Sequence, residues 1–198
     1  MLNYYNQNAK QLFDKYQSVD PDKVHASWLG HLPQKPGLAL DVGGGSGRDA
    51  IWLAKRGWEV IVVEPAAALL ELGQKSTEAY PVIWINDCLP TLAKFQMYQQ
   101  TFSLILVSGV LMHLPYQQRL DSMETLAGLM AKDSVLVVSL RQGPDSEGRA
   151  FYQVPAEEIV QFAENKSLQA EVTNTLEDVL KRDGVTWQTI IIEKRVVK

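Results

Sequence analysis

The segment of the chain best suited to hold a ligand is an acid followed by a run of glycines. It comes directly after the apolar residues 38–40 and leads into residues 48–54, which read as a helix. A glycine-rich turn between a strand and a helix lets the backbone approach a nucleotide-like ligand closely. The acid favours a cationic ligand, because a carboxylate would repel a pyrophosphate. The residues concerned are Asp41, Gly43, Gly44, Gly45 and Gly47.

The spacing of these glycines argues against two common nucleotide sites. A dinucleotide fingerprint, G-x-G-x-x-G, would need a small residue at position 48, where the chain has Arg48. A P-loop would need Gly-Lys-Ser/Thr after the turn, and that sequence does not follow. A nicotinamide-dependent oxidoreductase therefore stays as a less favoured alternative.

The elements around this turn follow the pattern of a parallel sheet. Five short apolar runs, rich in branched residues, resemble strands that are buried on both faces. Helical stretches are expected at about 47–56, 66–79 and 116–131, whereas 87–100 is less regular. Two further strands are expected in the tail, and the segment between them is too short for a helical crossover, so they must be antiparallel. The seven predicted strands lie near 38–42, 59–64, 82–86, 102–108, 134–140, 170–175 and 186–193.

The N-terminal residues have no strand of their own and predict a helical cap over the carboxyl edge of the sheet. Residues 4–17 place an apolar stripe on one helical face, and Asp20-Pro21 is a start signal for a second helix. We therefore expect one domain over 1–198, with a cap at 1–36 and an α/β core at 37–198. The stripe consists of Ala9, Leu12, Phe13 and Tyr16.

Composition narrows the class of protein. The 198 residues carry a net charge of −4, which argues against a broad nucleic-acid footprint. There is neither a run of about 18 apolar residues, as in a membrane span, nor a signal-peptide pattern at the N-terminus. The only cysteine, Cys88, allows no internal disulfide and no zinc cluster. We expect a soluble cytoplasmic protein, a monomer or a homodimer, without a metal site.

The acid-x-Gly-x-Gly-x-Gly turn in such a sheet resembles the class I S-adenosylmethionine (SAM)-dependent methyltransferases. The resemblance covers about residues 38–193 and implies their Rossmann-like fold. By this likeness Glu64, at the end of the second strand, would hold the ribose hydroxyls, and Asp87 would lie near the adenine, unless Asn86-Asp87 simply starts a loop. Cys88 is expected to be a small buried filler beside the adenine. The implied cofactor-binding residues are Asp41, Gly43, Gly44, Gly45, Gly47, Glu64, Pro65, Asp87, Cys88, Ser108 and Gly109.

The resemblance also implies SAM as methyl donor, S-adenosylhomocysteine as product and a small-molecule acceptor. Such an enzyme mainly aligns the reactants and excludes water. His113 is the candidate base, or else a loop histidine without a chemical role, while His25 and His31 are expected to be structural or exposed. Arg141 could clamp an anionic acceptor or pair with Asp145, Glu147 or Glu157, and Arg48 could pair with Asp49 or face the acceptor. The candidate acceptor residues are Tyr5, as a lid, with Arg48, Arg141, Arg149 and Tyr152.

One absence bears on the acceptor. Amino-methyltransferases of nucleobases or glutamine commonly have Asn/Asp-Pro-Pro-aromatic after the fourth strand, whereas this chain has Ser-Gly-Val-Leu at 108–111. Nucleobase methylation is therefore disfavoured. A binding module that retains the fold without catalysis stays as an alternative from another class.

Overall fold

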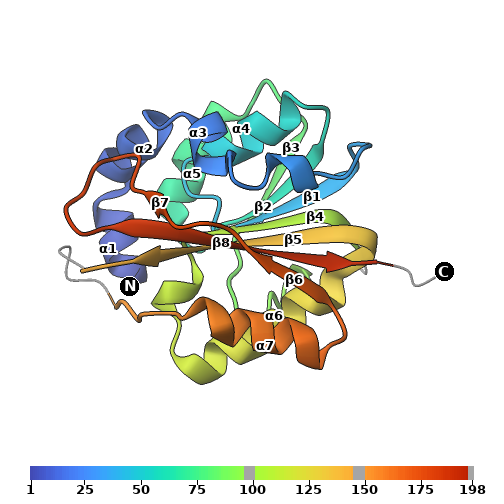
Figure 1. Cartoon of the computed structure of the whole chain (residues 1–198). Coiled ribbons are helices and arrows are strands. Elements are labelled where there is room, and N and C mark those ends of the chain that lie inside the picture. Colours follow the sequence, from blue (N-terminus) through green and yellow to red (C-terminus); the bar gives the residue numbers. More distant parts are fainter. Residues whose placement is uncertain (96–100, 145–149, 196–198) are drawn as a thin grey trace.

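The computed structural model describes residues 1–95, 101–144 and 150–195. Its centre is a mixed sheet with the strand order β3-β2-β1-β4-β5-β8-β6, and the short strand β7 also pairs with β8 (Figure 1). Strands β1 to β5 are parallel to one another, whereas β8 runs antiparallel to β5. The expected fold class is confirmed. The strands are β1 Leu38–Val42, β2 Glu59–Val63, β3 Val82–Ile85, β4 Phe102–Ser108, β5 Met130–Gln142, β6 Gln169–Val172, β7 Leu176–Glu177 and β8 Thr186–Lys194.

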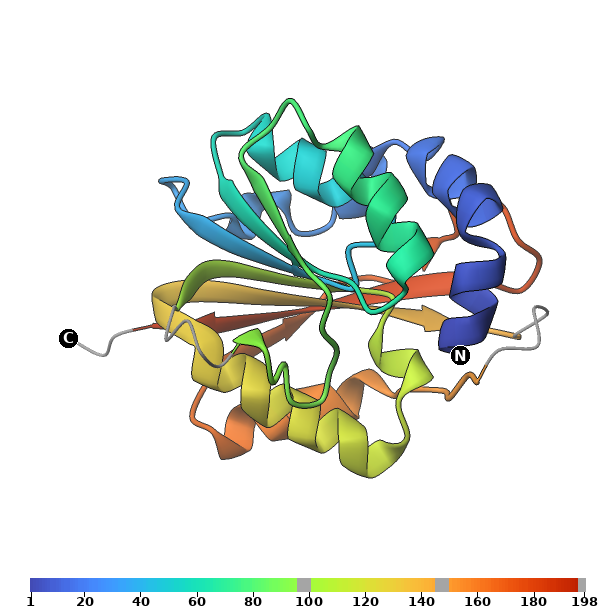
Figure 2. The ribbon, with the colours of Figure 1, turned by 180° about the vertical axis from the view of Figure 1, so that it is seen from behind.

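Helices cover both faces of this sheet (Figure 2). The strands are apolar on both sides, so that Leu40 and Ile105 face one core and Ala39 and Leu104 face the other. This double burial is why the strands read as continuous apolar runs rather than as alternating ones. On one face lie α6, Tyr116–Leu129, and α7, Ala156–Asn165; on the other lie α4, Arg48–Ala54, and α5, Ala67–Ser76.

The N-terminal cap consists of three short helices. They are α1, Leu2–Gln7, α2, Ala9–Gln17, and α3, Pro21–His25. The single helix expected over 4–17 is interrupted at Asn8, where the backbone leaves helical geometry and the side-chain amide donates to the Tyr4 carbonyl at 2.9 Å. Asp20 caps α3 as expected, since its carboxylate accepts from the Asp22 N–H at 3.0 Å. Helices α1 and α2 pack against α5.

Some boundaries differ from the expectation because strand pairing overrides local preference. Helix α6 ends at Leu129 and β5 begins at Met130, because Met130 pairs with Phe102 across a bulge in the β4–β5 ladder. The two-residue strand β7 was not expected. Two short 3₁₀ helices complete the described elements, η1 at Leu29–His31 and η3 at Leu111–His113. Within the ranges given above, no helix has the length and apolar character needed to cross a membrane.

Candidate functional site

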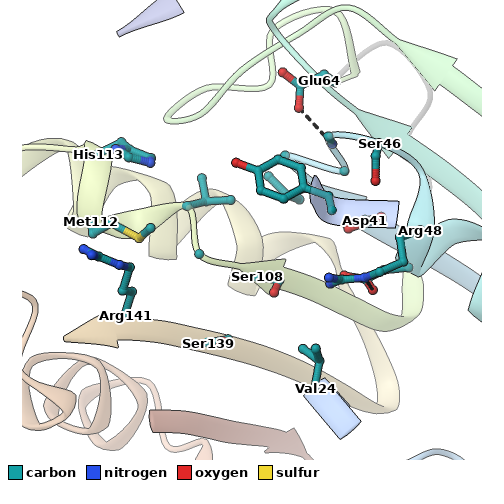
Figure 3. A pocket seen from close by; sticks show the side chains of 18 of the residues that line it. Val24, Asp41, Ser46, Arg48, Glu64, Ser108, Met112, His113, Ser139 and Arg141 are labelled. Atoms are coloured by element: carbon teal, nitrogen blue, oxygen red, sulfur yellow. Dashed lines mark hydrogen bonds and ion pairs between the residues drawn. The ribbon is translucent and has the colours of Figure 1, made fainter. Parts of the chain in front are cut away.

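A cavity of about 250 Å³ lies where the parallel strands end and the cap begins (Figure 3). We call it the edge cavity. Its walls come from the carboxyl ends of β1, β2, β4 and β5, from the cap, and from the segment between β6 and β8. Every predicted cofactor residue except Gly47 lines it, and so does the candidate base, His113. Of the five predicted acceptor-side residues, Tyr5, Arg48 and Arg141 line the cavity, Tyr152 does not, and Arg149 lies outside the described residues.

The glycine turn has the geometry that its sequence requires. Gly43, Gly45 and Gly47 all have positive φ, between 54° and 76°, a conformation that side chains other than glycine rarely adopt. A Cβ on Gly44 would come within 2.3 Å of Val62 Cγ1. Gly47 serves the packing of α4, because a Cβ there would meet Trp84 at 3.0 Å. The turn therefore presents backbone rather than side chains to the edge cavity.

Asp41 is a buried acid that the protein leaves without full compensation. The residue is 1% exposed, and its Oδ2 has no hydrogen-bond partner. Burial raises the pKa of Asp41 well above its ordinary value, and the negative charges of Asp49 and Glu64 act in the same direction against the opposing charge of Arg48. A buried, unsatisfied carboxylate is costly, and a cationic N–H donor in the cavity would remove that cost. The site thus fits the ammonium group of an amino-acid ligand.

Glu64 holds the glycine turn as well as facing the cavity. Its Oε2 accepts from the Gly45 N–H at 3.0 Å (Figure 3). Its Oε1 accepts from the Ala66 N–H at 2.8 Å. Burial raises the pKa of Glu64, while these two hydrogen bonds oppose the rise. Each carboxylate oxygen can accept a second hydrogen bond. The side chain can therefore bind neighbouring hydroxyls of a ligand without releasing the turn.

Asp87, the acid after β3, makes loop hydrogen bonds and also lines the edge cavity, so both roles considered for it remain compatible with its position. Asp87 Oδ1 accepts from the Cys88 N–H at 2.8 Å, and Oδ2 accepts from the Lys94 N–H at 2.7 Å. The prediction that Cys88 is buried is wrong: its side chain is exposed, because the neighbouring Leu89 takes the core position. Partial desolvation and the adjacent Asp87 charge raise the pKa of the Cys88 thiol, which suits a bystander rather than a nucleophile.

His113 joins the cap to the loop after β5. Its Nδ1 lies 2.8 Å from the Ala150 carbonyl, and its Nε2 lies 2.8 Å from the Tyr5 hydroxyl. A carbonyl only accepts, so Nδ1 carries the proton, and the Nε2 of the neutral ring accepts from Tyr5. The candidate base and the candidate lid are therefore hydrogen-bonded to each other at the cavity wall.

The two arginines of the site have different surroundings. Arg141 is buried, its guanidinium lies 4.8 Å from the centroid of the Phe151 ring, and one of its N–H groups donates to the Pro144 carbonyl. Two of its expected acidic partners, Asp145 and Glu147, lie outside the described residues. Arg48 pairs with Asp49 through two hydrogen bonds, so the acid pairing considered for it is observed, and it also lines the cavity.

The remaining predicted residues have structural surroundings. Tyr152 is 42% exposed and does not line the cavity, so the prediction that it contacts the acceptor is not supported; its N–H instead donates to the Met112 carbonyl at 2.7 Å. His25 is buried against Asp49, and His31 lies 3.3 Å from Glu193. Both histidines thus have the structural surroundings that were expected.

Sequence reasoning missed one wall of the cavity. The segment between β6 and β8 contributes apolar side chains, and β8 adds an aromatic one. No pattern pointed to this segment, because it has neither helical nor strand periodicity. The chief missed residues of this wall are Leu176, Val179, Arg182 and Trp187, and Val24 of the cap was missed as well.

Solved structures of other proteins share the fold of this chain. Solved structures with a similar fold include a 1,6-didemethyltoxoflavin N1-methyltransferase from Burkholderia thailandensis, holding 1,6-didemethyltoxoflavin and S-adenosylhomocysteine. It is 15% identical, with a TM-score of 0.71 over 97% of this chain and 84% of that chain. A magnesium protoporphyrin IX methyltransferase from Synechocystis with bound SAM is 17% identical, with a TM-score of 0.73 over 97% and 94%. At such identities the likeness establishes the fold.

Sequence comparison gives the family itself. A search of curated proteins found no significant match. A sequence model described as a methyltransferase domain, however, matches residues 10–175, which is most of the chain. The chain therefore belongs to the methyltransferase-domain family.

Proposed function

We propose that this protein transfers a methyl group from SAM to a small-molecule acceptor by in-line displacement. The observation that carries the proposal is the buried Asp41, whose Oδ2 faces no partner at the wall of a cavity that also contains Glu64. The family match and the SAM or S-adenosylhomocysteine bound in similar structures support the same cofactor. When bound, SAM supplies a methyl group activated by a sulfonium.

In this proposal the residues of the α/β core, 37–198, hold the cofactor. Asp41 binds the ammonium of its amino-acid end, and Glu64 binds the ribose hydroxyls. Asp87 and Cys88 lie beside the adenine, and Pro65, Ser108 and Gly109 complete the wall. The cap, 1–36, covers the site and excludes water, which would otherwise compete with the acceptor.

On the acceptor side, His113 takes up a proton where the acceptor arrives protonated. Its Nδ1–H bond to the Ala150 carbonyl stabilises the positive ring that would form, because a charged ring is a stronger donor than a neutral one. Tyr5 closes the cavity from the cap, and Arg141 favours an acceptor with an anionic group. The bound 1,6-didemethyltoxoflavin of one similar structure supports a small organic acceptor. We further propose a cytoplasmic location and a monomeric or homodimeric state.

A thermal-shift comparison tests the cofactor. At 100 times its dissociation constant, a ligand stabilises the fold by about 2.7 kcal/mol. SAM and S-adenosylhomocysteine should each raise the melting temperature, and NAD should not. Stabilisation by NAD alone would instead favour the oxidoreductase alternative.

A panel of small acceptors tests the reaction. Release of S-adenosylhomocysteine on addition of an acceptor is the expected result. A protein that binds SAM but releases none with acceptors of every heteroatom class would favour the non-catalytic alternative. Glu64→Ala should lose most of the affinity for SAM, because it removes the ribose contact and the support of Gly45 together.

A further inference from the structure

A chain of buried polar side chains runs from the cap to the wall of the edge cavity. His25 of α3 contributes Nε2, which lies 3.0 Å from Asp49 Oδ1. Asp49, in the first turn of α4, accepts from Arg48 Nε at 2.7 Å and from Arg48 Nη2 at 2.8 Å. His25 is 1% exposed and Asp49 is 7% exposed. The three side chains therefore form one connected unit that solvent barely reaches.

The direction of each hydrogen bond in this chain is defined. Trp28 Nε1 donates to His25 Nδ1 at 3.2 Å, so in the neutral ring Nε2 carries the proton and donates to Asp49. The ring also packs against Trp52, with 4.7 Å between the ring centroids. His25 is thus held on its edges and on its face, and it can turn in neither direction without losing a bond.

Asp49 is charged in this arrangement. Burial opposes its ionisation, but the Arg48 guanidinium and the His25 hydrogen bond outweigh burial and hold the pKa of Asp49 well below its usual range. A two-point bond between a carboxylate and a guanidinium also fixes the plane of the guanidinium. Asp49 therefore sets the orientation of Arg48.

Arg48 is held at the wall of the edge cavity, on the same side as Asp41 (Figure 3). Its side chain is 16% exposed, and its charge interacts with that of Asp41. A guanidinium has five N–H donors, and the bonds to Asp49 occupy only the Nε and Nη2 groups. An acid and a base that line one wall together match a ligand carrying both an ammonium and a carboxylate.

We propose that Arg48 binds the carboxylate of the cofactor's amino-acid end, and that Asp49 and His25 are positioning residues that hold it there. This inference rests on the proposed function and departs from the expectation that Arg48 faces the acceptor. It makes a cap residue that does not line the cavity, His25, a determinant of cofactor affinity. The cap then contributes to cofactor recognition as well as to exclusion of water.

A comparison of two ligands tests the contact between Arg48 and the carboxylate separately from the rest of the site. SAM carries the ammonium and the carboxylate, whereas decarboxylated SAM keeps the ammonium and lacks the carboxylate. Dissociation constants of both ligands are measured by calorimetry on the full chain. We expect the unchanged protein to prefer SAM, and Arg48→Met to weaken SAM binding by about tenfold to a hundredfold, the worth of a hydrogen bond between charged groups. Binding of decarboxylated SAM should change by a clearly smaller factor in the same variant, because that ligand has no carboxylate for Arg48 to bind.

The positioning role has its own variants. His25→Leu removes the donor to Asp49 and should weaken SAM by about threefold to tenfold, again without effect on decarboxylated SAM. His25→Gln retains an N–H donor at a similar reach and should restore most of the loss. Melting temperatures of the ligand-free variants identify any that fail to fold, and Arg48→Met tests the contact independently of packing in the cap.

Lys23 provides the matched control, because it lines the cavity but takes no part in the chain of hydrogen bonds. Lys23→Met should leave the ratio of the two dissociation constants unchanged. Equal affinity of the unchanged protein for the two ligands would overturn this inference while leaving the proposed function intact. The inference would also be overturned if Lys23→Met, and not Arg48→Met, abolished the preference for SAM over decarboxylated SAM. Failure to bind either ligand would refute the proposed function itself.

Discussion

Burial of Asp41 imposes a cost on folding, which the proposed ammonium contact would offset. Because burial raises its pKa, the folded protein keeps a proton to a higher pH than the unfolded chain, so this residue makes the free energy of unfolding fall as pH rises between the two pKa values. Asp41→Asn removes this pH-dependent loss of stability, because an amide does not ionise. We expect the variant without ligand to be more stable than the unchanged protein at pH 8, and the difference to shrink toward pH 4.

Urea unfolding at several pH values measures this effect, with the exposed Asp183→Asn as control. The same variant should lose most affinity for SAM, since an amide does not neutralise an ammonium. In the unchanged protein, SAM affinity should rise with pH as Asp41 ionises, with proton release seen by calorimetry in buffers of different ionisation enthalpy. If Asp41→Asn were less stable than the unchanged protein at pH 8, the conclusion that the buried Asp41 carboxylate destabilises the fold would be wrong.

The glycines of the turn are not equivalent at the residue level. Gly44→Ala would bring a Cβ to 2.3 Å from Val62 Cγ1 and to 2.9 Å from Asp41 Oδ2. We expect a loss of about 1–3 kcal/mol in stability, because neither neighbour has room to move. Gly128→Ala, in α6 with nothing within 4 Å, is the control and should gain up to about 1 kcal/mol. Chemical denaturation compares the free energies of unfolding of the two variants. Equal changes in both would mean that the turn can rearrange to accommodate a Cβ at position 44.

The sequence predicted cavity-lining residues better at the strand ends than in the loops. Asp41 and Glu64 were found from the turn and from strand ends, since parallel strands bring their carboxyl ends to one edge. Cys88 and Tyr152 were misplaced, because the direction of a side chain in an irregular loop depends on distant packing. The hydrogen bond between Tyr5 and His113 spans 108 positions, and no local pattern encodes such a contact.

At the level of elements, α1 is held by few contacts. It has no buried residues, and besides its packing against α5 it is joined to the rest of the protein by the Tyr5–His113 bond and by Asn6, which accepts from the Ala68 N–H at 3.0 Å. Tyr5→Phe removes one of these bonds, worth about 1 kcal/mol. We expect amide exchange of residues 2–7 to become about fivefold faster, without a change in the β-sheet. Tyr116→Phe, at a residue that is 57% exposed, is the control. Faster exchange throughout the protein would show instead that the bond supports the core.

The element order followed from the sequence, whereas several boundaries did not. Apolar runs identified the buried strands, because burial on both faces leaves little room for other residue types. The break at Asn8 and the early start of β5 at Met130 depend on a side-chain hydrogen bond and on a pairing with β4, respectively. Both are tertiary or side-chain effects that helical periodicity does not register.

At the level of the whole molecule, β8 joins two parts of the sheet. It pairs with β5 on one side and with β6 and β7 on the other, and Ile191 in its middle is 1% exposed. Ile191→Ala should cost about 2–5 kcal/mol of the free energy of unfolding. Val172→Ala, on the exposed side of β6, should cost less than about 1 kcal/mol. Denaturant titration distinguishes the two, and equal costs would contradict the central position of β8.

The two walls of the edge cavity come from separate stretches of chain. The wall that we propose for the cofactor belongs to the ends of β1, β2 and β4, while much of another wall belongs to residues 176–187, which include β7 and its pairing with β8. Substitutions in that later stretch leave the glycine turn and its acids untouched. Under the proposed function, substitutions there can change the methyl acceptor while the SAM site is kept. Paralogues with this fold can therefore diverge in acceptor specificity.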